Sequence, residues 1–155
     1  MTRITNLTYI LNDNNEVLLI KVIRGVGKGY WNAPGGKVEG SESLEAAARR
    51  EVEEEAGVKV FDLISMGVIE FVAPEKPEIG SRCYIYITTK YEGTPHPTDE
   101  GIPKWFKIDQ LLYDEMWAAD RYWLPQVLEK REKVFKRFYL DKNEKIIKIE
   151  DLKLS

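Results

Sequence analysis

Residues 36–58 read GKVEGSESLEAAARREVEEEAGV, and the expected organisation of the chain follows from them. Between the glycines lie residues 44–56, which are rich in the strong helix formers Ala, Glu and Arg. Ser41 or Ser43 can cap the start of this helix, and Gly57 is a residue type that commonly ends one. The pattern therefore predicts a glycine loop, a helix and a glycine stop.

The acidic residues of this helix fall on an unexpected face. A helix turns about 100° per residue, so Glu51 and Glu55 align with the apolar stripe and Glu54 lies beside it, whereas Glu53 points to solvent. Carboxylates on an inward face repel one another and are costly to bury. A divalent cation relieves both costs, and oxygen ligands suit Mg²⁺ or Mn²⁺. An ordinary solvated acidic helix is the alternative interpretation.

The same residues carry a resemblance to a known family. Gly36, Glu42 and the run REVEEEAGV at residues 50–58 stand at the spacing of the Nudix box, the signature of hydrolases that cut nucleoside diphosphates linked to another group. Every fixed position of that signature is filled. The resemblance implies an α/β fold, namely an α/β/α sandwich with a mixed β-sheet, in which the box forms a loop–helix–loop motif.

The resemblance also assigns roles to single residues. Glu54 and Glu55 are the first candidates as metal ligands, with Glu51 next. The backbone carbonyl of Gly36 is a further ligand in similar enzymes. Arg50 is expected to orient the carboxylates through charge-assisted hydrogen bonds.

Similar enzymes often recruit one more acid from a distant loop. Glu100, in the polar loop at residues 93–103, matches best and can serve as metal ligand or as general base. Its alternative is an exposed loop acid. Lys37, beside the glycine loop, is placed to meet a phosphate, and its alternative is a solvated lysine.

A second resemblance concerns the base of the substrate. From about residue 17 to its C-terminal hairpin, the chain is similar to family members that hydrolyse oxidised purine nucleoside triphosphates, most clearly over EMWAADRYWLP at residues 115–125. It implies that Trp117 stacks on the base, that Asn32 hydrogen-bonds it and that Asp120 reads its edge. A core aromatic is the alternative for Trp117.

Two departures from that pattern bear on the choice of base. Ala119 stands where those family members have the first of two adjacent aspartates, and Val26 stands where a phenylalanine faces the pocket. Both changes affect the preference for oxidised purines, and neither affects the hydrolysis.

Composition limits the class of protein. The 155 residues predict one domain, residues 1–155, and 43% apolar with 32% charged residues indicates a globular chain. A net charge of −3 argues against a stable nucleic-acid partner or an acidic membrane surface. The single Cys83 fits a reducing compartment, and no signal peptide or membrane span is recognisable, so we expect a cytoplasmic protein. Its oligomeric state is left as monomer or homodimer.

Strand signals occur on both sides of the helix. Residues 4–11 and 17–23 are expected to form a hairpin, and residues 58–72 one long or bent strand. Further expected elements are strands at residues 82–91 and 104–108, a helical turn at 109–112, a helix at 120–130 and a closing hairpin of residues 135–140 and 145–149.

The predicted function is that of a Mg²⁺-dependent pyrophosphohydrolase. Its expected substrate is a purine nucleoside triphosphate, oxidised or not, such as 8-oxo-dGTP, with the monophosphate and pyrophosphate as products. Hydrolysis of another linked diphosphate (ADP-ribose, a dinucleotide or an RNA 5′ end) is the alternative within enzymes. A nucleotide-binding module without hydrolysis is the alternative outside them.

Overall fold

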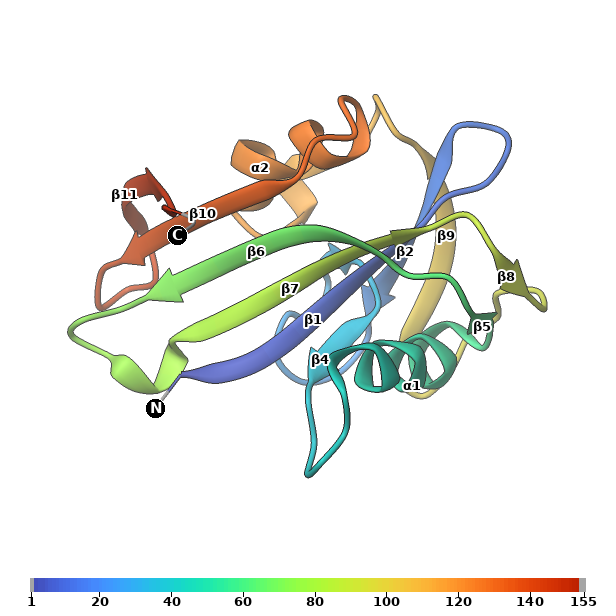
Figure 1. The fold of residues 1–155 in the computed structure, drawn as a ribbon, viewed down its shortest axis with the longest axis horizontal. Helices are drawn as coiled ribbons and strands as arrows, with labels where there is room; N and C mark the ends of the chain where they lie inside the picture. The colour runs from blue at the N-terminus through green and yellow to red at the C-terminus, as the bar shows by residue number, and fades with distance from the viewer. Residues whose placement is uncertain (1, 154–155) are drawn as a thin grey trace.

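A six-stranded mixed sheet dominates the computed structural model, which describes residues 2–153 of the chain (Figure 1). The first and last residues of the predicted domain, 1 and 154–155, lie outside the described residues. Across the sheet, the strands are β11 (Ile146–Asp151), β10 (Val134–Leu140), β6 (Ile64–Val72), β7 (Ser81–Thr88), β1 (Arg3–Ile10) and β4 (Gly35–Lys37). The pairs β1/β7 and β6/β10 are parallel, and the other neighbours are antiparallel.

Two smaller sheets and two helices complete the described fold. The three-stranded sheet has the order β3 (Trp31–Asn32), β2 (Glu16–Val22) and β9 (Gly101–Lys107), and the two-stranded sheet joins β5 (Lys59–Val60) to β8 (Tyr91–Glu92). The helices are α1 (Leu44–Ala56) and α2 (Asp120–Leu128), with short 3₁₀ turns at η1 (Pro77–Ile79) and η2 (Tyr113–Glu115). In Figure 1, α1 and α2 lie on opposite sides of the strands, which confirms the predicted α/β/α sandwich.

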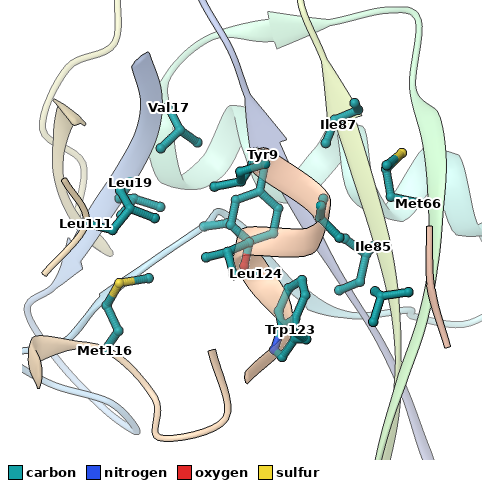
Figure 2. Packing of buried hydrophobic residues seen from close by; sticks show 14 of the residues in the cluster. Tyr9, Val17, Leu19, Met66, Ile85, Ile87, Leu111, Met116, Trp123 and Leu124 are labelled. Carbon is teal, nitrogen blue, oxygen red and sulfur yellow. The ribbon is translucent and has the colours of Figure 1, made fainter. Parts of the chain in front are cut away.

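Strand β2 separates two hydrophobic cores. Its side chains point alternately to its two faces. Val17 and Leu19 pack into the larger core on the side of α2, whereas Leu18 and Ile20 pack into the smaller core on the side of α1. Figure 2 shows the larger core, in which Trp123 of α2 lies against the other apolar side chains. Each fully buried side chain of this kind stabilises the fold by roughly 1.5–3 kcal/mol.

The expected hairpin of the first two strands is wrong. The turn forms, and Asn12 Oδ1 accepts hydrogen bonds from the backbone N–H groups of Asn14 and Glu16. Beyond it, a single bridge joins Leu11 to Val17, and the strands then enter different sheets. The physical reason is that β3 and β9 occupy the two hydrogen-bonding edges of β2, so no edge of this strand is left for β1.

Three other boundaries differ from the expectation. Residues 58–72 form two strands, because β5 pairs with β8 while the Phe61 carbonyl accepts a hydrogen bond from Arg49 Nη2 at 2.9 Å. The polar loop ends earlier than expected, since β9 begins at Gly101 and pairs with β2. The helical turn expected at residues 109–112 lies at η2 instead. By contrast, the helix from Asp120 and the closing hairpin of β10 and β11 are confirmed.

None of the helices in the described part of the chain is long and apolar enough to cross a membrane.

Gly67, in β6, provides a test of the sheet. Its φ is +104°, and a Cβ there would clash with the backbone carbonyl of Val134 in β10. We expect Gly67→Ala to destabilise the protein by about 3 kcal/mol or more in urea unfolding, because a strained φ and a backbone clash add together. Gly40→Ala is the matched control: its φ is +51° with open space around it, so it should cost only about 1–2 kcal/mol. Equal losses in the two variants would contradict the close approach of β6 and β10.

Candidate active site

Helix α1 begins and ends at the residues that its sequence indicates. Ser43 is the N-cap, and its Oγ accepts a hydrogen bond from the Ala46 N–H at 3.1 Å. Gly57 is the C-cap, with a left-handed φ of 75° and its N–H donated to the Glu53 carbonyl. The buried side of the helix carries small residues and one valine: Ala47, Ala48, Val52 and Ala56.

The acids of α1 lie where the helical period predicts. The side chain of Glu51 is 13% exposed, that of Glu54 is 54% exposed, and Glu53 faces solvent. Glu55 is half-buried beside the inward stripe. The solvated-helix interpretation is therefore wrong for Glu51 and Glu55, because both carboxylates are substantially removed from water.

Arg50 holds two of these carboxylates. Its Nη1 donates to Glu51 Oε1 at 2.9 Å and to Glu54 Oε2 at 3.3 Å. On its other edge, Nε and Nη2 donate to the two oxygens of Glu42 at 2.7 and 3.0 Å. This paired contact fixes the plane of the guanidinium and, through it, the carboxylates of α1. Glu42 was not among the predicted site residues, although its place in the box marks it.

Among the acids of α1, Glu55 has the most strongly raised pKa. Its pKa is raised to about 8, chiefly by burial and also by the nearby acids Glu51, Glu100 and Glu54, and the Gly35 N–H at 2.9 Å opposes this rise in part. Burial likewise raises the pKa of Glu51, and Arg50 opposes that change. The protonated form of Glu55 is therefore favoured to a higher pH than in an exposed glutamate.

The loop that precedes β9 brings Glu100 to this helix. Thr98 Oγ1 donates to the Glu55 carbonyl at 3.1 Å and accepts from the Glu100 N–H at 3.2 Å, so one hydroxyl joins the two segments. The Glu100 carboxylate accepts a hydrogen bond from Arg24 Nη2 at 2.9 Å. Glu100 is thus a loop acid placed beside Glu55, and Thr98 and Arg24 hold it there. Neither of these two partners had a recognisable signal in the sequence.

The predicted ligand set fits a hard divalent cation in chemistry, but its members are held apart. Within residues 2–153, no three acidic, histidine or cysteine side chains already converge as a metal site. The reason is that Arg50 holds Glu51 and Glu54 while Arg24 holds Glu100. The Gly36 carbonyl accepts a hydrogen bond from Asn6 Nδ2 at 3.2 Å. A cation would have to displace arginine contacts to gather these oxygens.

A large apolar cavity lies beside these acids, and Asn32, Trp117 and Asp120 all line it. Its volume is about 570 Å³. Trp117 is 38% exposed and meets the edge of Tyr30 at 5.2 Å between ring centroids, so it is no core residue. Trp31 and Trp123, by contrast, are buried in the larger core.

Two buried side-chain oxygens of residues that line this cavity have no partner in the described part of the chain. Asp120 Oδ2 is one, and burial raises the pKa of that carboxyl to about 7. The Trp123 indole lowers this pKa in part, although no hydrogen bond of normal geometry joins the two side chains. Asn6 Oδ1 is the other. Asn6 was not predicted, yet an asparagine within an apolar strand is itself a signal, because Asn is depleted in strands.

A second, polar cavity of about 320 Å³ adjoins the first. Glu55, Glu100 and Arg24 line it. The two cavities share Val26, Asn32 and Gly35, and Val26 is 88% exposed between them. Lys37 is not among the residues that line either cavity, and its carbonyl accepts a hydrogen bond from Arg50 at 3.1 Å.

Comparison with known proteins agrees with this geometry. The profile of the NUDIX domain matches residues 1–127. This chain belongs to the Nudix family. It is 42% identical over 116 residues to the oxidized purine nucleoside triphosphate hydrolase of Danio rerio, covering 75% of this chain and 74% of that protein. Its identity to the mouse protein of the same name is 36% over 131 residues, covering 84% and 83%.

Solved structures of Nudix proteins share the fold. The crystal structure of a MutT protein from Bacillus halodurans superposes with a TM-score of 0.83 at 25% sequence identity, covering 96% of each chain. The Nudix box of this protein is therefore the loop that contains Gly36 and the helix α1 that follows it. The predicted family, fold and hydrolase class are confirmed.

The raised pKa of Glu55 predicts a pH dependence of stability. The folded protein holds this proton more tightly than the unfolded chain, so the metal-free protein should lose stability as pH rises from 4.5 to about 8. Asp120 acts in the same direction up to about 7. In urea unfolding with EDTA, Glu55→Gln should remove roughly 1–3 kcal/mol of this loss. Glu53→Gln should leave the pH profile as in the wild type, and identical profiles for all three proteins would contradict the burial of Glu55.

Proposed function

We propose that this Nudix enzyme hydrolyses purine nucleoside triphosphates, including oxidised ones such as 8-oxo-dGTP, to the monophosphate and pyrophosphate. One observation carries the proposal: an apolar cavity with an exposed tryptophan adjoins a polar cavity lined by Glu55 and Glu100. A planar base suits the first cavity, and a metal-bound phosphate chain suits the second. The names of the fish and mouse relatives support the oxidised purine as the substrate.

Glu51, Glu54, Glu55, Glu100 and the Gly36 carbonyl are the proposed ligands of Mg²⁺, for which Mn²⁺ can substitute. The bound cation supplies neutralisation of the phosphate oxygens and activation of water. Arg50 keeps the carboxylates in one orientation, with Glu42 as its anchor. Glu100 or Glu55 is the base that receives the proton from the attacking water, since both border the polar cavity.

Arg24 is the proposed contact for the phosphates. It is the one basic side chain among the described residues that line the polar cavity, where it pairs with Glu100. If the cation takes Glu100, the guanidinium is released and can bind phosphate oxygens in the same place. Lys37, the sequence-based candidate, lies outside that lining.

The base is proposed to stack on Trp117, with polar contacts from Asn32 and Asp120. Asn32 Oδ1 accepts its own neighbour's N–H, that of Ala33, at 3.0 Å. Its amide Nδ2 is then the group that can donate to an acceptor on the base. Asp120 offers an unpaired oxygen, so the base should present an N–H donor to it.

The proposal extends to the setting of the enzyme. A net charge of −3 and a single buried Cys83 support a cytoplasmic enzyme without a stable nucleic-acid or membrane partner. A monomer or homodimer is proposed, and size-exclusion chromatography with light scattering distinguishes these.

A nucleotide panel tests the function. We expect release of pyrophosphate in the presence of Mg²⁺ from 8-oxo-dGTP and dGTP, with kcat/KM well above that for hydrolysis of ADP-ribose. A strong preference for ADP-ribose would assign the site to another linked diphosphate. Binding of all these nucleotides without hydrolysis would reduce the protein to a binding module.

Glu54→Gln tests the metal site, because it keeps the shape of the side chain and removes one charge. We expect kcat to fall by roughly a hundredfold or more, with the melting temperature of the metal-free protein nearly unchanged. Glu53→Gln, one residue away on the solvent side of α1, is the control and should keep wild-type kcat. Comparable losses in the two variants would mean that the inward face of α1 does not hold the cation.

Trp117→Ala tests the base site. The binding of every purine nucleotide should weaken by roughly 1–3 kcal/mol, the usual scale for a base stacked on an aromatic ring. The measurement is the dissociation constant for each nucleoside monophosphate by calorimetry. Trp105→Ala is unsuitable as a control because Trp105 packs against the smaller core, so Tyr122→Ala, at an exposed residue of α2, is used. An unchanged affinity in Trp117→Ala would place the base elsewhere.

A further inference from the structure

The loop between β8 and β9 closes the C-terminal end of α1. A helix leaves its last carbonyls without partners inside the helix. Two of these carbonyls accept hydrogen bonds from the loop: the His96 N–H donates to the Ala56 carbonyl at 3.1 Å, and Thr98 Oγ1 donates to the Glu55 carbonyl at 3.1 Å. Figure 1 shows β8 beside β5, the strand that follows α1, so the loop starts at this end of the helix. The loop is therefore docked on the element that carries the acids.

The docked loop lies closest to α1 at Gly57. A Cβ at this position would clash with the imidazole ring of His96. The ring thus lies directly on the residue that ends the helix, where only glycine leaves room for it. Because His96 and Thr98 are two residues apart, this packing also limits where the Thr98 hydroxyl can lie.

Thr98 connects the docked loop to Glu100. Its hydroxyl donates to the Glu55 carbonyl and also accepts a hydrogen bond from the Glu100 N–H at 3.2 Å. The Thr98 N–H donates to the Gly101 carbonyl at 3.0 Å, so two hydrogen bonds close the turn around Glu100. A single hydroxyl therefore fixes the backbone of Glu100 relative to that of Glu55.

Two further contacts of Glu100 come from outside this loop. Its carbonyl accepts a hydrogen bond from the Ile23 N–H at 3.3 Å, and its carboxylate accepts one from Arg24 Nη2 at 2.9 Å. The side chains of Arg24 and Glu100 are 64% and 46% exposed, and an ion pair so open to water holds its partners weakly. In the proposed function, Arg24 also leaves Glu100 for the phosphates. The Thr98 hydroxyl then still joins Glu100 to α1.

We propose that Thr98 is a positioning residue for the hydrolysis: it holds Glu100 beside Glu55 so that both carboxylates reach one divalent cation. This inference rests on the proposed function, in which both acids are ligands. Residues that orient metal ligands typically change metal affinity or activity by roughly 10–100-fold when they are removed. Thr98 needs its hydroxyl for this role, because the group acts as donor and acceptor at once. Serine can replace it, whereas valine and alanine cannot.

Variants that differ in the hydroxyl alone test this role. Thr98→Val is compared with the wild type, and Thr98→Ala with Thr98→Ser, so that a second pair remains if the valine variant misfolds. We expect Thr98→Val and Thr98→Ala to lower kcat for 8-oxo-dGTP by roughly 10–100-fold. The binding of Mn²⁺ to the nucleotide-free protein, measured from the EPR signal of the free ion, should weaken on the same scale. Thr98→Ser should stay close to the wild type in both measurements. Wild-type kcat and Mn²⁺ affinity in the variants without the hydroxyl would overturn the proposal.

Two controls separate positioning from general damage to the fold. Thr94 is exposed in the same loop, so Thr94→Val should keep the wild-type kcat and Mn²⁺ affinity. Thr98 lines neither cavity, so Thr98→Val should bind the nucleoside monophosphate in EDTA as tightly as the wild type does. A loss of that affinity equal to the loss of Mn²⁺ affinity would mean that the variant disturbs the whole site, and it would overturn the positioning role.

A double-mutant cycle with Glu100→Gln shows whether Thr98 acts through Glu100. If it does, Thr98→Val should lower kcat little further in the Glu100→Gln background, because two residues that act as a unit are not additive. The same fold-loss in both backgrounds would overturn the proposal, since the hydroxyl would then serve only the end of α1. The failure of the proposed function is distinct: in that case the wild-type protein leaves dGTP and 8-oxo-dGTP intact in the presence of Mg²⁺.

Discussion

The crowding of carboxylates on the inward side of α1 is the constraint on which the rest of the site depends. A helix that packs through alanines and one valine brings Glu51 and Glu55 close to the core, where their charges are poorly solvated. The fold offsets that cost locally, with Arg50 against Glu51 and the Gly35 N–H against Glu55. Both compensations are incomplete, so the helix retains an unmet demand for positive charge, which is the property that a metal-binding helix requires.

The surrounding elements place the acids of α1 next to an apolar cavity. Strand β2 separates the two cores, so the smaller one supports α1 and the larger one supports the loop before α2 that contains Trp117. Gly35 belongs to both environments, since its N–H contacts Glu55 while its strand pairs with β1 beside Asn6. The proposed metal site and the proposed base site are thus joined by a strand of only three residues, β4.

The arginines of the metal-free protein act as internal counter-ions. Arg50 and Arg24 satisfy the acids that a cation would otherwise bind, and this keeps a cluster of like charges from opening the structure. Arg50 is anchored by Glu42 and is partly covered, whereas Arg24 is exposed on a glycine-rich loop. The difference in anchoring matches the roles proposed for the two arginines: Arg50 positions carboxylates, and Arg24 exchanges a carboxylate for a phosphate.

The sequence by itself determined what depends on local period and local caps. Spacing within about twenty residues of chain is enough for three features. These are the limits of α1 at Ser43 and Gly57, the inward direction of Glu51 and Glu55, and the family signature. Tertiary structure alone decided which distant segments meet. Thr98 brings Glu100 to Glu55, Arg24 and not Lys37 lines the polar cavity, and the first two strands part because β3 and β9 occupy the edges of β2. The spacing of apolar residues and the helix or strand propensity indicate which side of an element is buried. They do not indicate which other element covers that side.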